Sequence, residues 1–199
     1  MNGSLTTLLG MGYYAMVSPG ESCCVIVETE RLLLRKWNDE DAVLVAHIYA
    51  KPEVMEFIPG GAWNDDRTAR AIARMRELDK EHGFGFYPIV LKSHGKVIGH
   101  CGLGLLEQTT EIEVAYILDS PFWGQGLASE AARAMLDYAF STLNIFRVVA
   151  VAFPKNVRSI GVMRSVGMTP VGPARHFGAT LVKYEKTVPQ PAPLQTLPP

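Results

Sequence analysis

The chain has 199 residues, a length that suits a single domain with a sizeable core. Its 19 basic and 20 acidic side chains give a formal net charge of -1, which disfavours a surface built for nucleic acid or an anionic membrane. The three cysteines fit neither a disulfide framework nor the ligand spacing of a zinc site. We therefore expect a cytoplasmic protein with reduced thiols and no bound metal.

The two ends of the chain differ in composition from its middle. Residues 1–24 mix Gly, Ser and Thr without periodicity and lack a basic signal-peptide start, and no apolar run approaches the roughly 20 residues that span a bilayer. Residues 188–199 are rich in proline, which removes backbone donors and offers no core face. We expect a poorly ordered arm at 1–24, one domain at 25–187 and a disordered tail at 188–199.

The apolar periodicity of the middle region alternates between strand and helix. Residues 25–37, "VIVETERLLLRKW", read as one strand, and Asn38 precedes a helix over about 39–50. A second helix runs from Asn64 to Gly83. Three strands of an antiparallel meander follow in "FGFYPIVLK", "KVIGHCGLGLL" and "TEIEVAYIL". A helix to about residue 143, the strand "FRVVAVAF", a short helix from residue 156 and two closing strands complete a mixed α and β domain.

The stretch "SPFWGQGLASEAARAM", residues 120–135, places Gly124 and Gly126 directly before an alanine-rich helix. Such a turn lets an anion approach the backbone, where the amides near Gln125 to Ser129 are unpaired first-turn donors. A phosphate is the natural ligand, although a glycine turn that merely precedes a packed helix gives the same letters. The chain has no Gly-Lys-Ser/Thr of a Walker loop, and it lacks the acidic residue that completes a dinucleotide-binding fingerprint.

Four segments in order resemble the GNAT superfamily of acetyl-coenzyme A dependent N-acetyltransferases. They are "ETERLLLRKWNDEDA", "PEVMEFI", "EVAYILDSPFWGQGLASEA" and "PKNVRSIGVMRSVGM", and the resemblance covers about residues 27–187. Within the superfamily the chain is most similar to the branch of ribosomal-protein N-terminal (alanine) acetyltransferases. The resemblance implies an α+β fold with a mostly antiparallel twisted sheet of about seven strands, flanked by about four helices and splayed at its centre to hold acetyl-coenzyme A.

The resemblance also implies which residues bind the cofactor. The strand at Tyr116, Ile117 and Leu118 would offer its backbone to the pantetheine arm, and Asn156 would lie beside it, although an N-cap role for Asn156 is compatible. The superfamily's pyrophosphate loop maps onto Trp123, Gly124, Gln125, Gly126, Leu127 and Ala128, with Ser129 next in the helix. Trp123 departs from the usual Gln or Arg, which removes a side-chain phosphate contact but leaves the backbone cradle.

Acetyl transfer to an amine requires a base for the amine proton and a proton for the leaving thiolate. The resembling branch often carries a glutamate at Glu113 and a serine at Ser159, which we expect to be the base and the acid. A solvated strand carboxylate, helix-start hydrogen bonding by Ser159 and a proton-donating water are the alternatives. Met163 occupies the position where many members place a tyrosine acid, and His100 is the alternative base.

The acceptor is less legible than the cofactor. Its pocket would come from the two early helices, the loop "EFIPGGAWNDD" and the last hairpin, where Glu56, Asp65, Asp66 and Glu107 could attract a cation or only be solvated. We expect an amine acceptor, foremost a protein or peptide N-terminus, and a monomer or homodimer. A small amine such as a polyamine or an antibiotic, and a non-catalytic acyl-coenzyme A binding module, stay open.

Overall fold

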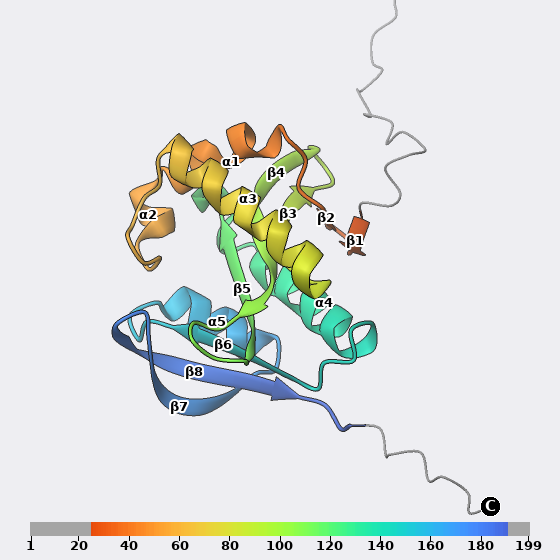
Figure 1. Ribbon diagram of the computed structural model, residues 1–199, viewed down its shortest axis with the longest axis vertical. Coiled ribbons are helices and arrows are strands. Elements are labelled where there is room, and N and C mark those ends of the chain that lie inside the picture. Colours follow the sequence, from red (N-terminus) through yellow and green to blue (C-terminus); the bar gives the residue numbers. More distant parts are fainter. Residues whose placement is uncertain (1–24, 191–199) are drawn as a thin grey trace, which may run out of the picture.

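The computed structural model describes residues 25–190 of the chain (Figure 1). The predicted arm at 1–24 and residues 191–199 of the predicted tail lie outside the described residues. The elements are β1 (Val25–Glu28), β2 (Leu32–Arg35), α1 (Asp41–Tyr49), α2 (Pro52–Met55), α3 (Asp65–His82), β3 (Phe86–Leu91), β4 (Lys96–Leu105), β5 (Ile112–Leu118), the 3-10 helix η2 (Ser120–Phe122), α4 (Leu127–Ser141), β6 (Arg147–Ala152), α5 (Val157–Ser165), β7 (Thr169–His176) and β8 (Ala179–Thr187).

One open sheet holds all eight strands described, in the order β1-β2-β3-β4-β5-β6-β8-β7. Every neighbouring pair is antiparallel except β5 and β6, which are parallel and joined through α4. The predicted α+β fold with a mostly antiparallel sheet is confirmed, as are the meander of β3, β4 and β5 and the strand-helix-strand unit. The described residues contain eight strands and five α-helices, one more of each than we expected.

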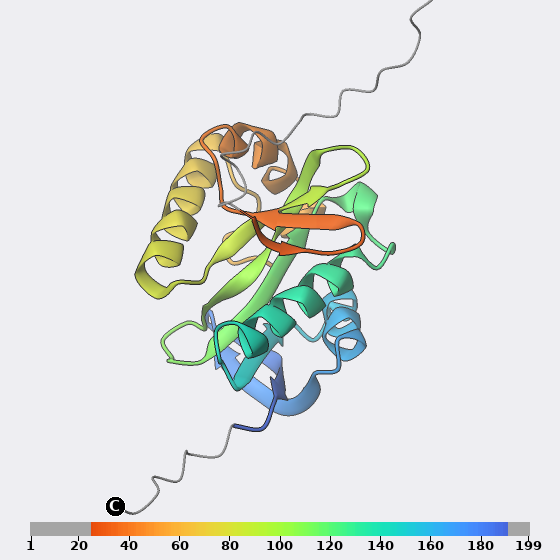
Figure 2. The ribbon, with the colours of Figure 1, turned by 90° about the vertical axis from the view of Figure 1, so that its right-hand side faces the viewer.

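Helices cover both faces of the sheet (Figures 1 and 2). On one face α4 contributes Leu127, Ala131, Met135 and Leu136 to a core that also takes in side chains from β2 to β6. On the other face α1 and α3 pack Val45, Ile48, Tyr49 and Ile72 into a second core. None of the described helices is long and apolar enough to cross a membrane.

The expected single strand over residues 25–37 is wrong, because the chain reverses within it and forms the hairpin of β1 and β2. The Thr29 hydroxyl accepts a hydrogen bond from the amide of Leu32, and the carboxylate of Glu130 on α4 accepts from the hydroxyl of Thr29 and the amide of Arg31. The turn carries no glycine or proline, and a side chain about a hundred positions away completes it. Local sequence patterns therefore could not reveal it.

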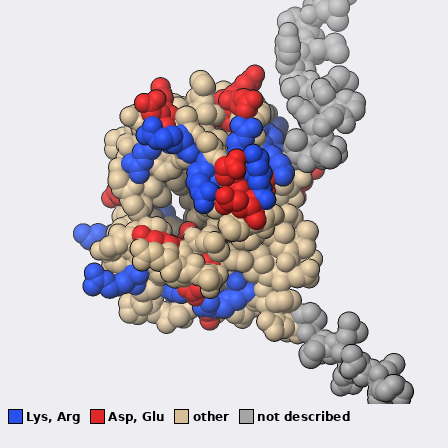
Figure 3. All heavy atoms as spheres, viewed as in Figure 1, with Lys and Arg blue, Asp and Glu red and all other residues tan. Residues whose placement is uncertain are grey.

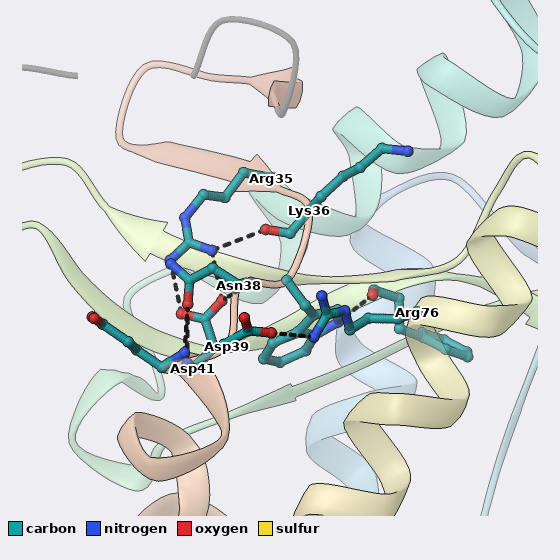
Figure 4. Close-up of polar contacts among 9 residues, drawn as sticks. Arg35, Lys36, Asn38, Asp39, Asp41 and Arg76 are labelled. Atoms are coloured by element: carbon teal, nitrogen blue, oxygen red, sulfur yellow. Dashed lines mark hydrogen bonds and ion pairs between the residues drawn. The ribbon is translucent and has the colours of Figure 1, made fainter. Parts of the chain in front are cut away.

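The start of α1 is fixed by a buried carboxylate (Figure 4). Arg35 at the end of β2 donates two hydrogen bonds to Asp41, at 2.6 and 2.8 Å, and the amide of Asn38 donates to the same group. The side-chain oxygen of Asn38 accepts from the amides of Glu40 and Asp41, so Asn38 holds the first turn although the helix begins at Asp41 rather than residue 39. A fully buried carboxylate is tolerated because it is paired and hydrogen-bonded.

The limits of α3 match the expectation. The Asn64 side chain accepts from the amide of Arg67, and Gly83 ends the helix with a φ of 73°. Both caps are local interactions, which the sequence alone can specify. The four-residue α2, between α1 and α3, is an element that the sequence pattern did not predict.

The sheet divides between β5 and β6. These strands share a single register pair, Glu113 with Val149. By contrast, β5 pairs with β4 along the whole length of β5, and β6 pairs with β8 from Arg147 to Ala152. Beyond Glu113 the two strands separate, as Figure 1 shows. The splay that the resemblance implied is therefore present.

Candidate active site

The splay opens into a cavity of about 510 Å³. Its walls come from β5 between Glu113 and Leu118, the turn before α4 with the first residues of that helix, the end of β6, α5, α2 with the segment after it, and the β7–β8 hairpin. The space-filling view shows the molecule hollowed between the part that carries α2 and the part that carries α5 and β8 (Figure 3). Eleven of the twelve predicted cofactor residues line it: Tyr116, Ile117, Leu118, Trp123, Gly124, Gly126, Leu127, Ala128, Ser129, Asn156 and Ser159.

The turn before α4 has the geometry of an anion site. Gly124 and Gly126 have φ values of 74° and 76°, in the left-handed region where glycine carries no steric cost. Gly126 is the N-cap of α4, and as a glycine it has no side chain to cap the helix. Among the described residues, no hydrogen bond donated by the backbone amides of Gln125 to Ser129 is found. These donors sit at the positive end of a 15-residue helix.

Gln125 is the one predicted cofactor residue outside the cavity wall. Its side-chain amide donates to the carbonyl of Pro121, and its own carbonyl accepts from Arg31. Arg31 also pairs with Glu130 at 2.6 Å, so the β1–β2 turn is tied to the first turn of α4. Gln125 therefore stabilises the loop through these two hydrogen bonds, and its side chain does not line the cavity.

Trp123, which stands where the superfamily usually has Gln or Arg, makes contacts of a different kind. Its indole nitrogen donates to the carbonyl of Leu118 at 2.8 Å, and its ring carries the guanidinium of Arg158 at 4.1 Å from the ring centre. Arg158 lies on α5 and lines the cavity. A cation therefore stands at the loop although the loop's own first residue has no charge.

Asn156 and Ser159 lie together at the start of α5. The side-chain oxygen of Asn156 accepts from the amide of Ser159 at 3.1 Å, so its N-cap role is real. The hydroxyl of Tyr116 donates to the carbonyl of Ser159 at 3.0 Å and lies 3.1 Å from the Ser159 hydroxyl. Burial raises the pKa of Tyr116 above its ordinary value, which keeps this phenol neutral and able to donate.

Glu113 lies at the point where β5 and β6 part, and it lines the cavity. Among the described residues no hydrogen bond or ion pair to its side chain is found. Burial raises its pKa from the ordinary 4.5 to about 7, because the charged form loses water without gaining a partner. A carboxyl group with such a pKa can take up and release a proton near neutral pH.

The alternative base lies elsewhere. His100 is buried on the α1 and α3 side of the sheet, with Nδ1 2.6 Å from the Tyr49 hydroxyl, and it does not line the cavity. Burial lowers its pKa to about 4, so the ring is neutral. Of the acidic side chains considered for the acceptor, Glu56, Asp65, Asp66 and Glu107, none lines the cavity.

Three features of the site were missed in the sequence: the cation of Arg158, the Tyr116 hydroxyl beside Ser159, and Glu53 in the cavity wall. Of these three features, only the position of Tyr116 could have been predicted from neighbouring residues, because Tyr116 lies on the same strand as Glu113. Within residues 25–190 no cluster of three or more His, Cys, Asp or Glu side chains could hold a metal ion.

Residues 31–169 match the family described as the acetyltransferase (GNAT) domain. The chain is 34% identical over 151 residues to the uncharacterized N-acetyltransferase p20 of Bacillus licheniformis, and the alignment covers 75% of this chain and 85% of that relative.

Two solved structures have the same fold. An acetyltransferase from Agrobacterium tumefaciens str. C58 is 25% identical with a TM-score of 0.74, and the alignment covers 94% of this chain and 100% of that one. The ribosomal-protein-S5-alanine acetyltransferase from Vibrio fischeri is 22% identical with a TM-score of 0.68, over 80% and 94% of the two chains. Because residues 31–169, more than half of the chain, match the GNAT domain, the chain belongs to the GNAT acetyltransferase family.

Proposed function

We propose that the protein transfers the acetyl group of acetyl-coenzyme A to a primary amine, by direct attack within a ternary complex, with Glu113 as the general base. The observation that carries this proposal is the unpaired carboxyl of Glu113, with a pKa of about 7, in the same cavity as the anion turn of α4. A base works best when its pKa lies close to the working pH.

The cofactor side of the proposal uses mostly backbone. The amides from Gln125 to Ser129 would hold the pyrophosphate, with Arg158 as the added positive charge. The pantetheine arm would follow β5 at Tyr116 and Ile117, where β6 no longer pairs with it. The carbonyl of Leu118 already accepts a hydrogen bond from the indole of Trp123.

Each proton in the proposed reaction has a donor and an acceptor. Acetyl-coenzyme A supplies a thioester carbonyl; the N–C bond forms, the C–S bond breaks, and Glu113 takes the amine proton directly or through water. The hydroxyl proton of Ser159 passes to the thiolate, and Ser159 regains a proton from water while Glu113 releases the amine proton to water, so both side chains return to their starting states. With the Tyr116 hydrogen directed to the Ser159 carbonyl, the Ser159 hydroxyl donates to the Tyr116 oxygen, and it would turn from that oxygen to the sulfur when the cofactor binds.

For the acceptor we propose the α-amine of a protein or peptide N-terminus. Such an amine has an ordinary pKa of about 7.7 to 8.0, so roughly a tenth is neutral at pH 7 and a single weak base is sufficient. The cavity wall offers one carboxylate besides Glu113, that of Glu53, whereas a polyamine or an antibiotic with several amines would need more.

The test is a coenzyme A thiol-release assay with acetyl-coenzyme A, run against peptides and small amines, with mass spectrometry to find the acetylated product. We expect amine-dependent thiol release and an acetylated amine. A protein that binds acetyl-coenzyme A tightly but acetylates no amine in the panel would be a binding module, and the proposed function would be wrong.

A further inference from the structure

Three of the four phenylalanines that line the cavity lie outside the segment that forms the turn before α4. Phe57 follows α2, Phe153 follows β6, and Phe177 lies in the turn between β7 and β8, and all three line the cavity. The rings of Phe57 and Phe153 have centres 6.1 Å apart and are tilted by 36°. Three loops far apart in the sequence thus place aromatic rings around one space.

Charge is scarce in the same wall. Among residues 25–190, the acidic side chains in this wall are those of Glu53 and Glu113, and the basic one is that of Arg158, which is stacked on Trp123. Glu53 already accepts a hydrogen bond from Ser120. An ammonium group that loses water here without a carboxylate partner is strongly disfavoured. The wall therefore suits one amine, at Glu113, attached to an apolar group.

Phe177 is held against a backbone preference. Its φ is 53°, in the left-handed region that a bulky side chain rarely adopts. Its amide donates to the carboxylate of Glu107, in the β4–β5 loop, and its side chain is 39% exposed. Phe177 and Gly178 form the two-residue turn between β7 and β8, in which His176 pairs with Ala179, and hairpin turns of this kind need a positive φ at both positions. The contact with Glu107 ties this turn to the β4–β5 loop.

We propose that Phe57, Phe153 and Phe177 form the acceptor's side-chain subsite, and that it takes an apolar, preferably aromatic, group beside the amine. This inference rests on the proposed acetyl transfer and narrows its substrate class. A peptide with an N-terminal phenylalanine or leucine and a small arylalkyl amine share the required chemistry. The two sources are separated by the acceptors used in the test.

The first experiment measures kcat/KM for acetylation of otherwise identical peptides that begin with Phe, Leu, Ser or Lys, and of phenylethylamine, ethanolamine and spermidine. We expect the apolar acceptor of each set to exceed its polar counterpart by about ten- to a hundredfold, the effect of burying such a side chain. A faster reaction of Phe and Leu peptides than of phenylethylamine identifies the peptide as the source, and the reverse identifies the small amine.

The second experiment tests the ring of Phe177. Phe177→Gly removes the ring and also suits the positive φ, so the fold should be kept. We expect kcat/KM for the apolar acceptors to fall about tenfold, with the polar acceptors and the KM of acetyl-coenzyme A unchanged. Phe177→Leu should restore most of the loss. Val171→Ala, on the same hairpin at a residue that is 51% exposed and outside the cavity wall, is the matched control and should change nothing.

The outcomes separate the two claims. If amines are acetylated but apolar and polar acceptors react equally, or spermidine reacts best, the subsite is wrong and the acetyl transfer stands. An unchanged ratio of apolar to polar acceptors in Phe177→Gly also overturns the subsite. If no amine is acetylated, the proposed function fails and the subsite fails with it.

Discussion

The two halves of the cavity are built from different materials. The half beside α4 consists largely of backbone: two glycines with positive φ and a row of unpaired amides at a helix N-terminus. The half beside α2 and the β7–β8 turn is lined by side chains, among them Phe57, Phe153 and Phe177, and Glu113 lines the same cavity. A backbone site needs a fixed local pattern of residues, whereas a side-chain site can draw on any loops that the fold brings together.

The largest expected effect is at the junction of the two halves. Glu113→Gln keeps the size of the side chain but removes the charge of the base. The turnover number should fall by roughly 10² to 10⁴ near pH 7, with coenzyme A affinity unchanged. In the wild type, turnover should rise with pH through about 7, as Glu113 loses its proton. Steady-state rates from pH 6 to 9 measure both effects, and a mutant with wild-type turnover at pH 6.5 would exclude Glu113.

Glu111, two residues before Glu113, is the matched control. Hydrogen bonds from Lys183 and Arg147 hold its pKa below the ordinary range, and it lies outside the cavity wall. Glu111→Gln should keep turnover and lower stability at neutral pH, a loss that shrinks in acid as the wild-type carboxylate is protonated.

Glu113→Gln should have the opposite effect on stability. Because the pKa of Glu113 is raised in the folded state, the wild type loses stability as the pH rises from about 4.5 to about 7. The mutant should therefore match the wild type at pH 5 and be more stable at pH 8, by about 1 kcal/mol after allowance for solvent. Urea unfolding at both pH values measures this. Equal effects of the two mutations would contradict the contrast between the carboxyls.

The next effect tests the backbone half. Gly126→Asp should weaken coenzyme A binding at least tenfold, because a negative charge would enter the anion site. Gly126→Asn has the same shape without the charge, and both residues tolerate a positive φ. A Cβ at Gly126 would clash with nothing and would be in ordinary van der Waals contact with the Arg31 guanidinium, at 3.6 Å. Calorimetry should show a much smaller loss for Asn, and equal losses would argue against an anion at this turn.

Ser159→Ala should have a smaller effect, a fall in turnover of up to about tenfold. A thiol with an ordinary pKa of about 8.5 is a fair leaving group, so water can replace the hydroxyl as proton donor. Coenzyme A affinity should not change, since the amide of Ser159 keeps its bond to Asn156. Rapid-quench measurement of the chemical step is the appropriate readout. A loss as large as that of Glu113→Gln would mean that protonation of the thiolate limits the reaction.

The smallest effect is expected at Arg158. Arg158→Gln should weaken coenzyme A binding about two- to fivefold at low salt, with little difference at high salt, because an exposed charge is screened. Arg70→Gln, on α3 and outside the cavity wall, makes the same change in net charge and should have no effect. Calorimetric titrations at two salt concentrations decide between them. If the two variants bound coenzyme A equally well at both salt concentrations, Arg158 would have no part in cofactor binding.

The same division explains what the sequence could predict. The ends of α3 follow from Asn64 and Gly83, and the anion turn follows from Gly124 and Gly126, because each is set by neighbouring residues. The β1–β2 hairpin and the place of Arg158 could not be predicted, because they depend on Glu130 and Trp123, which are distant in the sequence.

The acceptor half was the least predictable part. The four acids suggested by the sequence do not line the cavity, whereas Phe57, Phe153 and Phe177 do. Glu107, one of those acids, instead accepts a hydrogen bond from the amide of Phe177. The sequence could identify the loops that contribute to the pocket, but the direction in which their side chains lie is decided by tertiary contacts.

The most direct test of the account is the release of coenzyme A thiol by the wild-type protein from acetyl-coenzyme A, with and without a panel of peptides and small amines at pH 7.5. We predict that an amine accelerates thiol release, that an equal amount of acetylated amine forms, and that Glu113→Gln abolishes most of this acceleration while it still binds coenzyme A. Thiol release that no amine accelerates, or acceleration that survives unchanged in Glu113→Gln, would contradict the account.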